Sequence, residues 1–333
     1  DGGVAGICGP AWPGTTPYIV TELKPIILGK DPFATELLWD QMHRICVHGR
    51  AGAAMMAISV VDNALWDLKG KALGQPVYRL LGGPTREEMP AYASMLGYAV
   101  EDMGLVRERA REFKERGFKA QKWFFRHGPM SGPEGMKLNV ELVRTLRRAL
   151  GDEIDIMLDC WQAWDANYTI RIAEQIEEYH PRWLEECAMP DRIDTYRRIR
   201  EKTNIPLSGA EHEYTRWGFK RFIDAGALDI IQPDLSWAGG ISEVMKIAAY
   251  ASTYDLITIP HQGVSPAGMA FSAAQSPIHT PYVEMLIKRS AADYFFATEP
   301  AKAKNGMLRP SDRPGLGVEL DPAKIEKEEE LLA

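Results

Sequence analysis

Ionisable side chains end one short apolar run after another along the chain. Asp159 ends DIMLD, Glu185 and Glu186 end RWLEE, and Glu211 with His212 follows IPLS in the stretch GAEHE. Asp159, Glu185 and Glu211 are spaced 26 residues apart. Three carboxylates brought to one place need a positive partner, because an unpaired buried charge is costly. Oxygen ligands without a thiolate or paired imidazoles favour a hard divalent ion, with Mg²⁺ first.

The next two runs end in a carboxylate and an imidazole. Asp234 ends LDIIQPD, and His261 follows LITIP 27 residues later. An aspartate next to a histidine orients the imidazole and raises its basicity, so this pair is a candidate general base. Taken alone, an acidic residue after a strand is as often a helix N-cap, and a lone histidine is more often a buried packing residue. The regular spacing is what favours a functional site.

The elements that must position these residues alternate between strand and helix. Eight apolar runs read as strands and are separated by amphipathic patterns with apolar residues three and four apart. The runs cover residues 90–95, 119–124, 155–159, 182–186, 205–210, 228–234, 256–260 and 282–286. Such alternation predicts βαβ units, and eight of them favour a closed (β/α)7β TIM-like barrel, in which all strand ends face one mouth. An open doubly wound sheet is the alternative.

Two stretches fall outside this rhythm and predict a second, α+β capping domain. Residues 1–87 hold a Gly/Pro-rich opening and the long helical pattern of residues 53–74, and residues 306–321 read as a turn and a short returning strand. We therefore expect a capping domain at 1–87, a catalytic barrel at 88–300 and a returning segment at 301–333. The opening DGGVAGICG resembles the second half of a hairpin, so we also expect a segment upstream of Asp1.

Composition narrows the class of partner. The formal net charge is −7, which argues against nucleic acid and anionic membranes as partners and favours a small-molecule ligand. The four cysteines form no CxxC pair and predict a reducing, cytoplasmic setting. No apolar run approaches the length of a membrane-spanning helix.

Seven segments in this order resemble the enolase superfamily. The similarity covers nearly the whole chain and is strongest for the mandelate racemase/muconate lactonizing enzyme group, within it for acid-sugar dehydratases of the L-rhamnonate dehydratase type. The segments are AISVVDNALWDLKGKALGQPVYRLLGG (57–83), MLDCW (157–161), RWLEE (182–186), GAEHEYTRWGF (209–219), DIIQPDLSWAGGISE (229–243), PHQG (260–263) and GLGVEL (315–320). Sites of this superfamily use a Lys or His base with Mg²⁺ to form an enediolate.

The resemblance implies a role for each candidate residue. Asp159, Glu185 and Glu211 would bind Mg²⁺, and Asp234 with His261 would form the base. Glu284 would contact the substrate carboxylate, with Lys122 near it, and His212 is a second imidazole able to assist the departing hydroxyl. The implied reaction is dehydration of an aldonate to a 2-keto-3-deoxy acid, and a homo-oligomer is implied as well.

Departures from the family pattern bear on the reaction type. Many members carry Lys-x-Lys in the second strand, whereas here the stretch is KWF and Phe124 holds the second position. A base on only one face of the substrate's α-carbon favours elimination of water over inversion of that carbon. An epimerase or racemase, or a catalytically silent metal-binding scaffold, is the alternative. Trp161 and Cys187 match the rhamnonate dehydratase branch.

Overall fold

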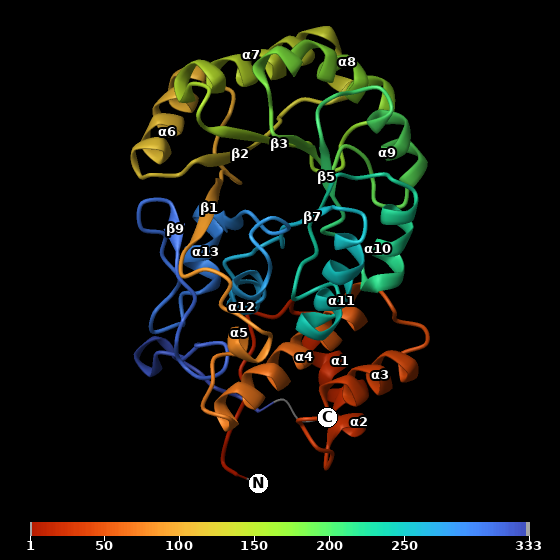
Figure 1. Cartoon of the computed structure of the whole chain (residues 1–333), viewed down its shortest axis with the longest axis vertical. Coiled ribbons are helices and arrows are strands. Elements are labelled where there is room, and N and C mark those ends of the chain that lie inside the picture. Colours follow the sequence, from red (N-terminus) through yellow and green to blue (C-terminus); the bar gives the residue numbers. More distant parts are fainter. Residues whose placement is uncertain (1, 331–333) are drawn as a thin grey trace.

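The computed structural model describes residues 2–330 and contains the eight expected parallel strands (Figure 1). Their order in the sheet is β7-β6-β5-β4-β3-β2-β1-β8. The strands are β1 (Met89–Ser94), β2 (Ala120–Phe124), β3 (Asp155–Asp159), β4 (Trp183–Glu185), β5 (Leu207–Gly209), β6 (Ile230–Ile231), β7 (Ile257–Thr258) and β8 (Val283–Leu286). Every strand lies within or beside its predicted run.

The sheet curls into a closed barrel, so the open doubly wound alternative is wrong. Backbone hydrogen bonds from Thr258 N to His279 O (2.7 Å) and from Val264 N to Glu284 O (3.0 Å) link the two ends of the strand order. An apolar cluster fills the interior below the ionisable groups and includes Tyr92, Met157 and Trp183. The barrel is therefore a packed core with a polar layer at the carboxyl ends of its strands.

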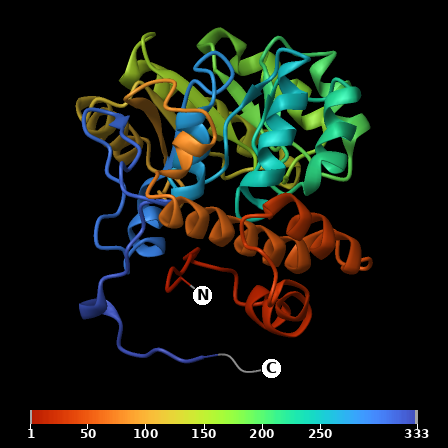
Figure 2. The same cartoon turned by 60° about the horizontal axis from the view of Figure 1, so that its bottom comes forward.

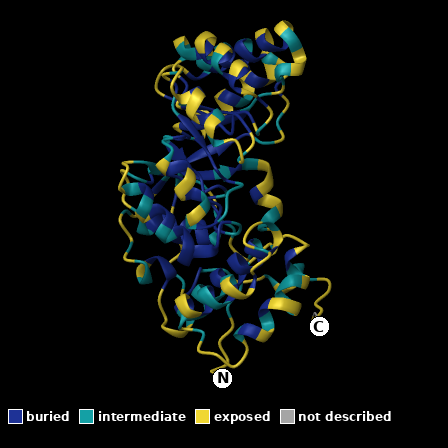
Figure 3. Ribbon diagram, turned by 90° about the vertical axis from the view of Figure 1, so that its right-hand side faces the viewer, coloured by how far each residue is buried: buried dark blue, intermediate teal, exposed yellow. Residues whose placement is uncertain are grey.

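Helices surround the barrel, and most of them have a buried side and an exposed side (Figure 3). Their first turns are capped where the sequence offers an acceptor, as at Asp102, which accepts from Gly104 N and Leu105 N. The helices are α6 (Met103–Glu115), α7 (Gly132–Leu150), α8 (Ala166–Ile176), α9 (Ile193–Arg200), α10 (Thr215–Asp224), α11 (Gly240–Ser252), α12 (Pro266–Ala274) and α13 (Ile287–Asp293). Short 3-10 turns lie at Pro129–Ser131, Glu177–Tyr179 and Pro322–Lys324.

A second group of helices precedes the barrel in the chain. It comprises α1 (Thr15–Tyr18), a π-helical turn η1 (Ile19–Leu23), α2 (Lys24–Ile27), α3 (Thr35–Ile45), α4 (Gly52–Ala72) and α5 (Val77–Leu80). The long helix α4 lies across the barrel, with both terminal segments on its far side (Figure 2). Three of its buried polar side chains, Ser59, Asp62 and Asn63, contact the segment between β6 and the first turn of α11, where Asn63 donates to Leu235 O (2.9 Å).

The opening of the chain differs from the expected half-hairpin. Residues 2–13 form no strand in the structure, and Ile7 N donates to the Asp67 carboxylate (2.7 Å) on α4. Within residues 2–87, β-type pairing is limited to the bridge between Pro76 and Gly315. The opening segment is therefore held by a side-chain acceptor and not by a neighbouring strand.

The C-terminal segment returns along the molecule as expected. Its short strand β9 (Met307–Leu308) pairs antiparallel with β1, and Gly315 then meets the segment before α5. The domain boundaries at residues 87 and 300 stay predictions. None of the helices in residues 2–330 has the length and apolar character needed to cross a membrane.

Candidate active site

Neighbouring strands place their terminal side chains at one level of the barrel mouth. The parallel register pairs Phe124 with Asp159 and Asp159 with Glu185, and Glu185 in turn pairs with Ser208 on β5. Asp159, Glu185 and Glu211 are all buried. The predicted convergence of these strand ends is therefore present, although the side chains do not all meet at one point.

Lys122 is the central cation of the mouth. Its ammonium lies 3.2 Å from Asp159, 2.8 Å from Glu284 and in close contact with Glu185. Burial lowers the pKa of Lys122, but the surrounding carboxylates outweigh burial and raise it well above its ordinary value. Burial raises the pKa of Glu284, but Lys122, His261 and the Gln262 N–H together outweigh burial and lower it to about 2. Lys122 is thus an ammonium shared among three acids.

Glu185 is fixed by donors on its second oxygen as well. The Trp183 indole N–H and the Gln232 amide each donate to Glu185 Oε2 at 2.8 Å. Gln232 precedes Asp234 by two residues, so strand alternation would have placed it facing the mouth. The sequence analysis did not single it out.

Asp234 and His261 form the expected carboxylate–imidazole pair. His261 Nδ1 lies 2.8 Å from Asp234 Oδ2, and the other Asp234 oxygen accepts from Ser236 N (2.6 Å). With Nδ1–H directed at the carboxylate, Nε2 is left facing the mouth, 3.7 Å from Glu211. Burial lowers the pKa of His261, but Glu211 and Asp234 outweigh it and raise the pKa to about 10. In the neutral ring, the hydrogen bond to Asp234 holds the proton on Nδ1, so that Nε2 can accept a proton.

His212 belongs to a second carboxylate–imidazole pair that the sequence analysis missed. Its Nδ1 lies 3.0 Å from the buried carboxylate of Glu186, whose other oxygen accepts from Gln162 (2.9 Å). Burial lowers the pKa of His212, but the hydrogen bond and charge of Glu186 raise it overall. Glu186 therefore orients His212 much as Asp234 orients His261.

Left-handed backbone conformations gather directly after the strand ends. Trp161, Gln162, Glu186, Ala210 and Gln262 have φ values of 46°, 64°, 47°, 72° and 48°. Such conformations cost residues other than glycine on the order of 1 kcal/mol or more and concentrate at functional sites. Here they turn the chain sharply where the site residues leave the sheet.

The mouth carries more negative than positive charge. Burial, followed by repulsion from Glu185, raises the pKa of Asp159 well above its ordinary value. Burial also raises the pKa of Glu211 to about 7, although His261 acts in the opposite direction. Lys122 alone cannot neutralise so many acids, so the donor set fits a hard divalent cation.

The three expected metal ligands are evenly spaced in the sequence, but they do not form one group in the structure. Asp159 and Glu185 lie together around Lys122, whereas Glu211 lies next to the two imidazoles, with His212 Nδ1 at 3.6 Å. Among the described residues, the three ligand atoms found within 4.8 Å of one another come from Glu186, Glu211 and His212. Glu211 is common to both sets, and the set Asp159, Glu185 and Glu211 stays a prediction.

Phe124 stands where a second lysine base would be. The Lys122 ammonium lies 5.4 Å from the centre of its ring, so Phe124 does border the mouth. Trp123, between them, is fully buried in the core. The turn WAGG leads into α11, whose N-terminus is occupied by side chains of α4, since Asp62 accepts from Ser242 N (2.9 Å).

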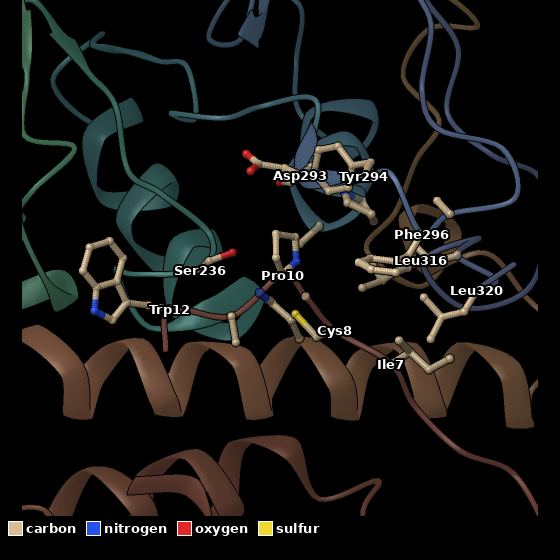
Figure 4. A pocket seen from close by; sticks show the side chains of 18 of the residues that line it. Ile7, Cys8, Pro10, Trp12, Ser236, Asp293, Tyr294, Phe296, Leu316 and Leu320 are labelled. Atoms are coloured by element: carbon tan, nitrogen blue, oxygen red, sulfur yellow. The ribbon is translucent and has the colours of Figure 1, made fainter. Parts of the chain in front are cut away.

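A cavity of about 690 Å³ adjoins the mouth (Figure 4). It lies between the opening segment, the loops after β6 and β7, and the C-terminal segment, and its walls are mainly apolar. Residues at its wall include Cys8, Trp12, Ser236, Tyr294, Phe296 and Leu316. Both ends of the chain therefore contribute to one cavity.

Family models match both parts of the chain. Residues 1–82 match the mandelate racemase/muconate lactonizing enzyme N-terminal domain, and residues 105–324 match the enolase C-terminal domain-like model. L-rhamnonate dehydratase of Saccharopolyspora erythraea is 36% identical over 316 residues, which are 92% of this chain and 77% of that protein.

Solved structures share the fold over almost all of the chain. The 3,6-anhydro-D-galactonate cycloisomerase from Zobellia galactanivorans has a TM-score of 0.86 at 33% identity, covering 96% of this chain and 88% of its own. Rhamnonate dehydratase from Gibberella zeae complexed with Mg has a TM-score of 0.83 at 34% identity, covering 92% and 74%.

Proposed function

The chain belongs to the mandelate racemase/muconate lactonizing enzyme family of the enolase superfamily, and we propose that it is a Mg²⁺-dependent acid-sugar dehydratase. It is a hydro-lyase of that superfamily. The substrate class proposed is an aldonate similar to rhamnonate, which the relatives from Saccharopolyspora and Gibberella are named for. The product is a 2-keto-3-deoxy acid.

One observation supports this proposal above the others. His261 is held by Asp234 so that Nε2 faces a buried acidic cluster, and Phe124 takes the place of a second base. A single imidazole face suits proton removal followed by elimination, while inversion needs a base on each face of the carbon. The epimerase or racemase alternative is therefore less well supported.

The chain's own residues can be assigned to the steps. Lys122, paired with Glu284, would hold the substrate carboxylate at the mouth. His261 Nε2 would then accept the α-proton, and the electron pair moves into the carboxylate to give an enediolate. Held by Asp159, Glu185 and Glu211, Mg²⁺ would supply positive charge that stabilises this enediolate.

Elimination completes the reaction. The enediolate electrons form the carbon–carbon double bond as the β-hydroxyl leaves, taking a proton from His261 or His212 to depart as water. The resulting enol takes up a proton at carbon 3 and releases the proton of its hydroxyl at carbon 2, which gives the 2-keto-3-deoxy acid. His212 has Glu186 to hold it in place for such a transfer (3.0 Å).

A panel of hexonates, pentonates and diacids, assayed with Mg²⁺ for keto-acid formation, tests the function. His261→Asn should abolish turnover while calorimetry still detects Mg²⁺ binding. His180→Asn is the matched control, since His180 is exposed and has a left-handed φ of 47° that asparagine tolerates. Retained turnover in His261→Asn would refute the base, and no turnover of any acid by the unmodified protein would revive the scaffold alternative.

The remaining expectations stay predictions. A homo-oligomer follows from the resemblance and is checked by light scattering after size-exclusion chromatography. The cytoplasmic setting follows from cysteine usage, and the small net negative charge still favours small-molecule ligands over nucleic acid or membranes.

A further inference from the structure

Trp237 contacts both imidazoles of the mouth. The centre of its ring lies 4.9 Å from that of His261 and 5.5 Å from that of His212, with interplanar angles of 43° and 38°. Tilted aromatic pairs at such distances attract one another and limit ring rotation. One indole therefore restrains the candidate base and the second imidazole together.

The backbone of Trp237 is tied to the backbone of Asp234, the residue whose carboxylate orients His261. Trp237 N donates to Asp234 O (3.1 Å), and Ala238 N donates to the same carbonyl (2.8 Å). Helix α4 holds the loop from outside the barrel, through Asn63 at Leu235 O (2.9 Å) and Ser59 at Gly239 N (2.8 Å). The indole is thus carried by a loop that is fixed on both sides.

Trp237 also forms part of the wall of the apolar cavity next to the mouth. The cavity reaches Ser236 and Trp237 after β6 and Gln262 after β7, whereas the two histidines are not among its lining residues. Removing the indole would join the two spaces. Water from the cavity would then reach the faces of both rings.

From this geometry we propose that Trp237 is a positioning residue, which fixes His212 and His261 relative to each other and separates them from the cavity. The inference concerns how the rings are held, and its catalytic consequence rests on the proposed function. The effect of Trp237 on the reaction passes through the two histidines.

Chemical labelling tests the positioning without any turnover. Diethyl pyrocarbonate modifies accessible imidazoles, and peptide mass spectrometry gives a rate for each histidine. Trp237→Ala should label several-fold faster than the unmodified protein at His212 and His261, with the exposed His180 as internal reference. If His212 and His261 are labelled in Trp237→Ala at the same rates as in the unmodified protein, the inference is overturned. A rise at all histidines would mean general loosening and would overturn it too.

Kinetics test the consequence. Trp237→Ala should lower kcat by up to about 100-fold, the scale expected when reacting groups are misplaced by an ångström. KM should change little, and the ratio of α-deuterium wash-in to keto acid formed should rise as the second imidazole loses its position. Trp237→Phe keeps a flat ring and should restore most of kcat. Trp164→Phe, an indole packed near α8, is the matched control and should leave the ratio unchanged.

Two further readouts separate the possible failures. If Trp237→Ala does not fold, Trp237→Leu keeps apolar volume without a flat ring and should show the same faster labelling. If no acid sugar is turned over but labelling changes as expected, the proposed function fails and the positioning stands. If the unmodified protein turns over substrate and Trp237→Leu matches it in labelling and ratio, the positioning fails.

Discussion

Glu211 is the acidic side chain shared by the two groups that a divalent cation could join. On one side are Asp159 and Glu185, which follow the regular spacing of strand ends and pair with Lys122 in the structure. On the other are Glu186 and His212, whose ligand atoms lie within 4.8 Å of one another and of a ligand atom of Glu211. Mg²⁺ prefers oxygen ligands, which favours the all-carboxylate group.

Substitution at three positions distinguishes these groups. We expect Asp159→Asn and Glu211→Gln each to weaken Mg²⁺ binding at least about 10-fold, because a charged oxygen ligand is lost. Glu186→Gln should keep Mg²⁺ affinity and lower kcat, because His212 loses the carboxylate that orients it. Isothermal titration calorimetry measures the affinity and a keto-acid assay measures kcat.

The opposite pattern would contradict this assignment. If Glu186→Gln loses Mg²⁺ binding while Asp159→Asn keeps it, the cation lies at Glu186, Glu211 and His212. Glu134→Gln on α7 is a suitable control, since this exposed glutamate lies outside both groups.

At the scale of elements, α4 performs the capping that α11 cannot provide for itself. Helix α11 begins at Gly240 and has no capping side chain of its own. Asp62 accepts from Ser242 N (2.9 Å), Asn63 from Ile241 N (3.0 Å) and Ser59 from Gly239 N (2.8 Å). These contacts satisfy N–H groups that would otherwise be buried without partners.

Asp62 makes this contact dependent on pH. Burial raises its pKa to about 7, although hydrogen bonds from Ser242 oppose the shift. A carboxyl group whose folded pKa exceeds its unfolded value favours folding at low pH. That contribution to stability is lost as pH rises from about 4 to about 7, and above pH 7 it changes no further.

Asp62→Asn should remove this loss. Relative to the unmodified protein, the variant should gain on the order of 3 kcal/mol in free energy of unfolding between pH 4 and pH 7. Urea unfolding at several pH values measures the difference. The exposed Asp152→Asn is the control and should follow the unmodified protein, and a pH-independent difference for Asp62→Asn would contradict the raised pKa.

Which elements could be predicted depends on whether a local pattern encodes them. Strand runs and amphipathic helices carry their own periodicity, so all eight strands were placed correctly. The runs at 228–234 and 256–260 shorten to Ile230–Ile231 and Ile257–Thr258, because beyond them only Asp234 and His261 still pair, as an isolated bridge. That shortening arises from barrel geometry, which no local pattern contains.

The same limit applies to the candidate site. Strand-end spacing identified Asp159, Glu185, Glu211, Asp234 and His261, because position along the barrel follows from the order of elements. The ion pairs of Lys122 and the contacts of Trp237 depend on side-chain packing across the mouth. Trp237 lies in a loop, where no periodicity indicates direction.

At the scale of the whole molecule, Asp67 on α4 joins three parts of the chain. Its carboxylate accepts from Ile7 N and Leu316 N, each at 2.7 Å, and pairs with Lys71 (2.6 Å). The opening and C-terminal segments are therefore held on the same helix (Figure 2). They are also the segments that meet at the apolar cavity.

We expect Asp67→Ala to release both segments at once. The buried N–H of Leu316 and the half-buried N–H of Ile7 would lose their acceptor, which should lower the free energy of unfolding by about 2 to 4 kcal/mol. Hydrogen exchange should quicken at residues 5–12 and 314–320 and stay unchanged in β3 and β4, because the barrel core does not depend on this contact. Asp312→Ala, which removes an exposed acceptor for the Tyr78 hydroxyl (2.6 Å), is the control and should cost about 1 kcal/mol or less. Faster exchange in only one of the two segments would show that they are held independently, since a shared anchor must release them together.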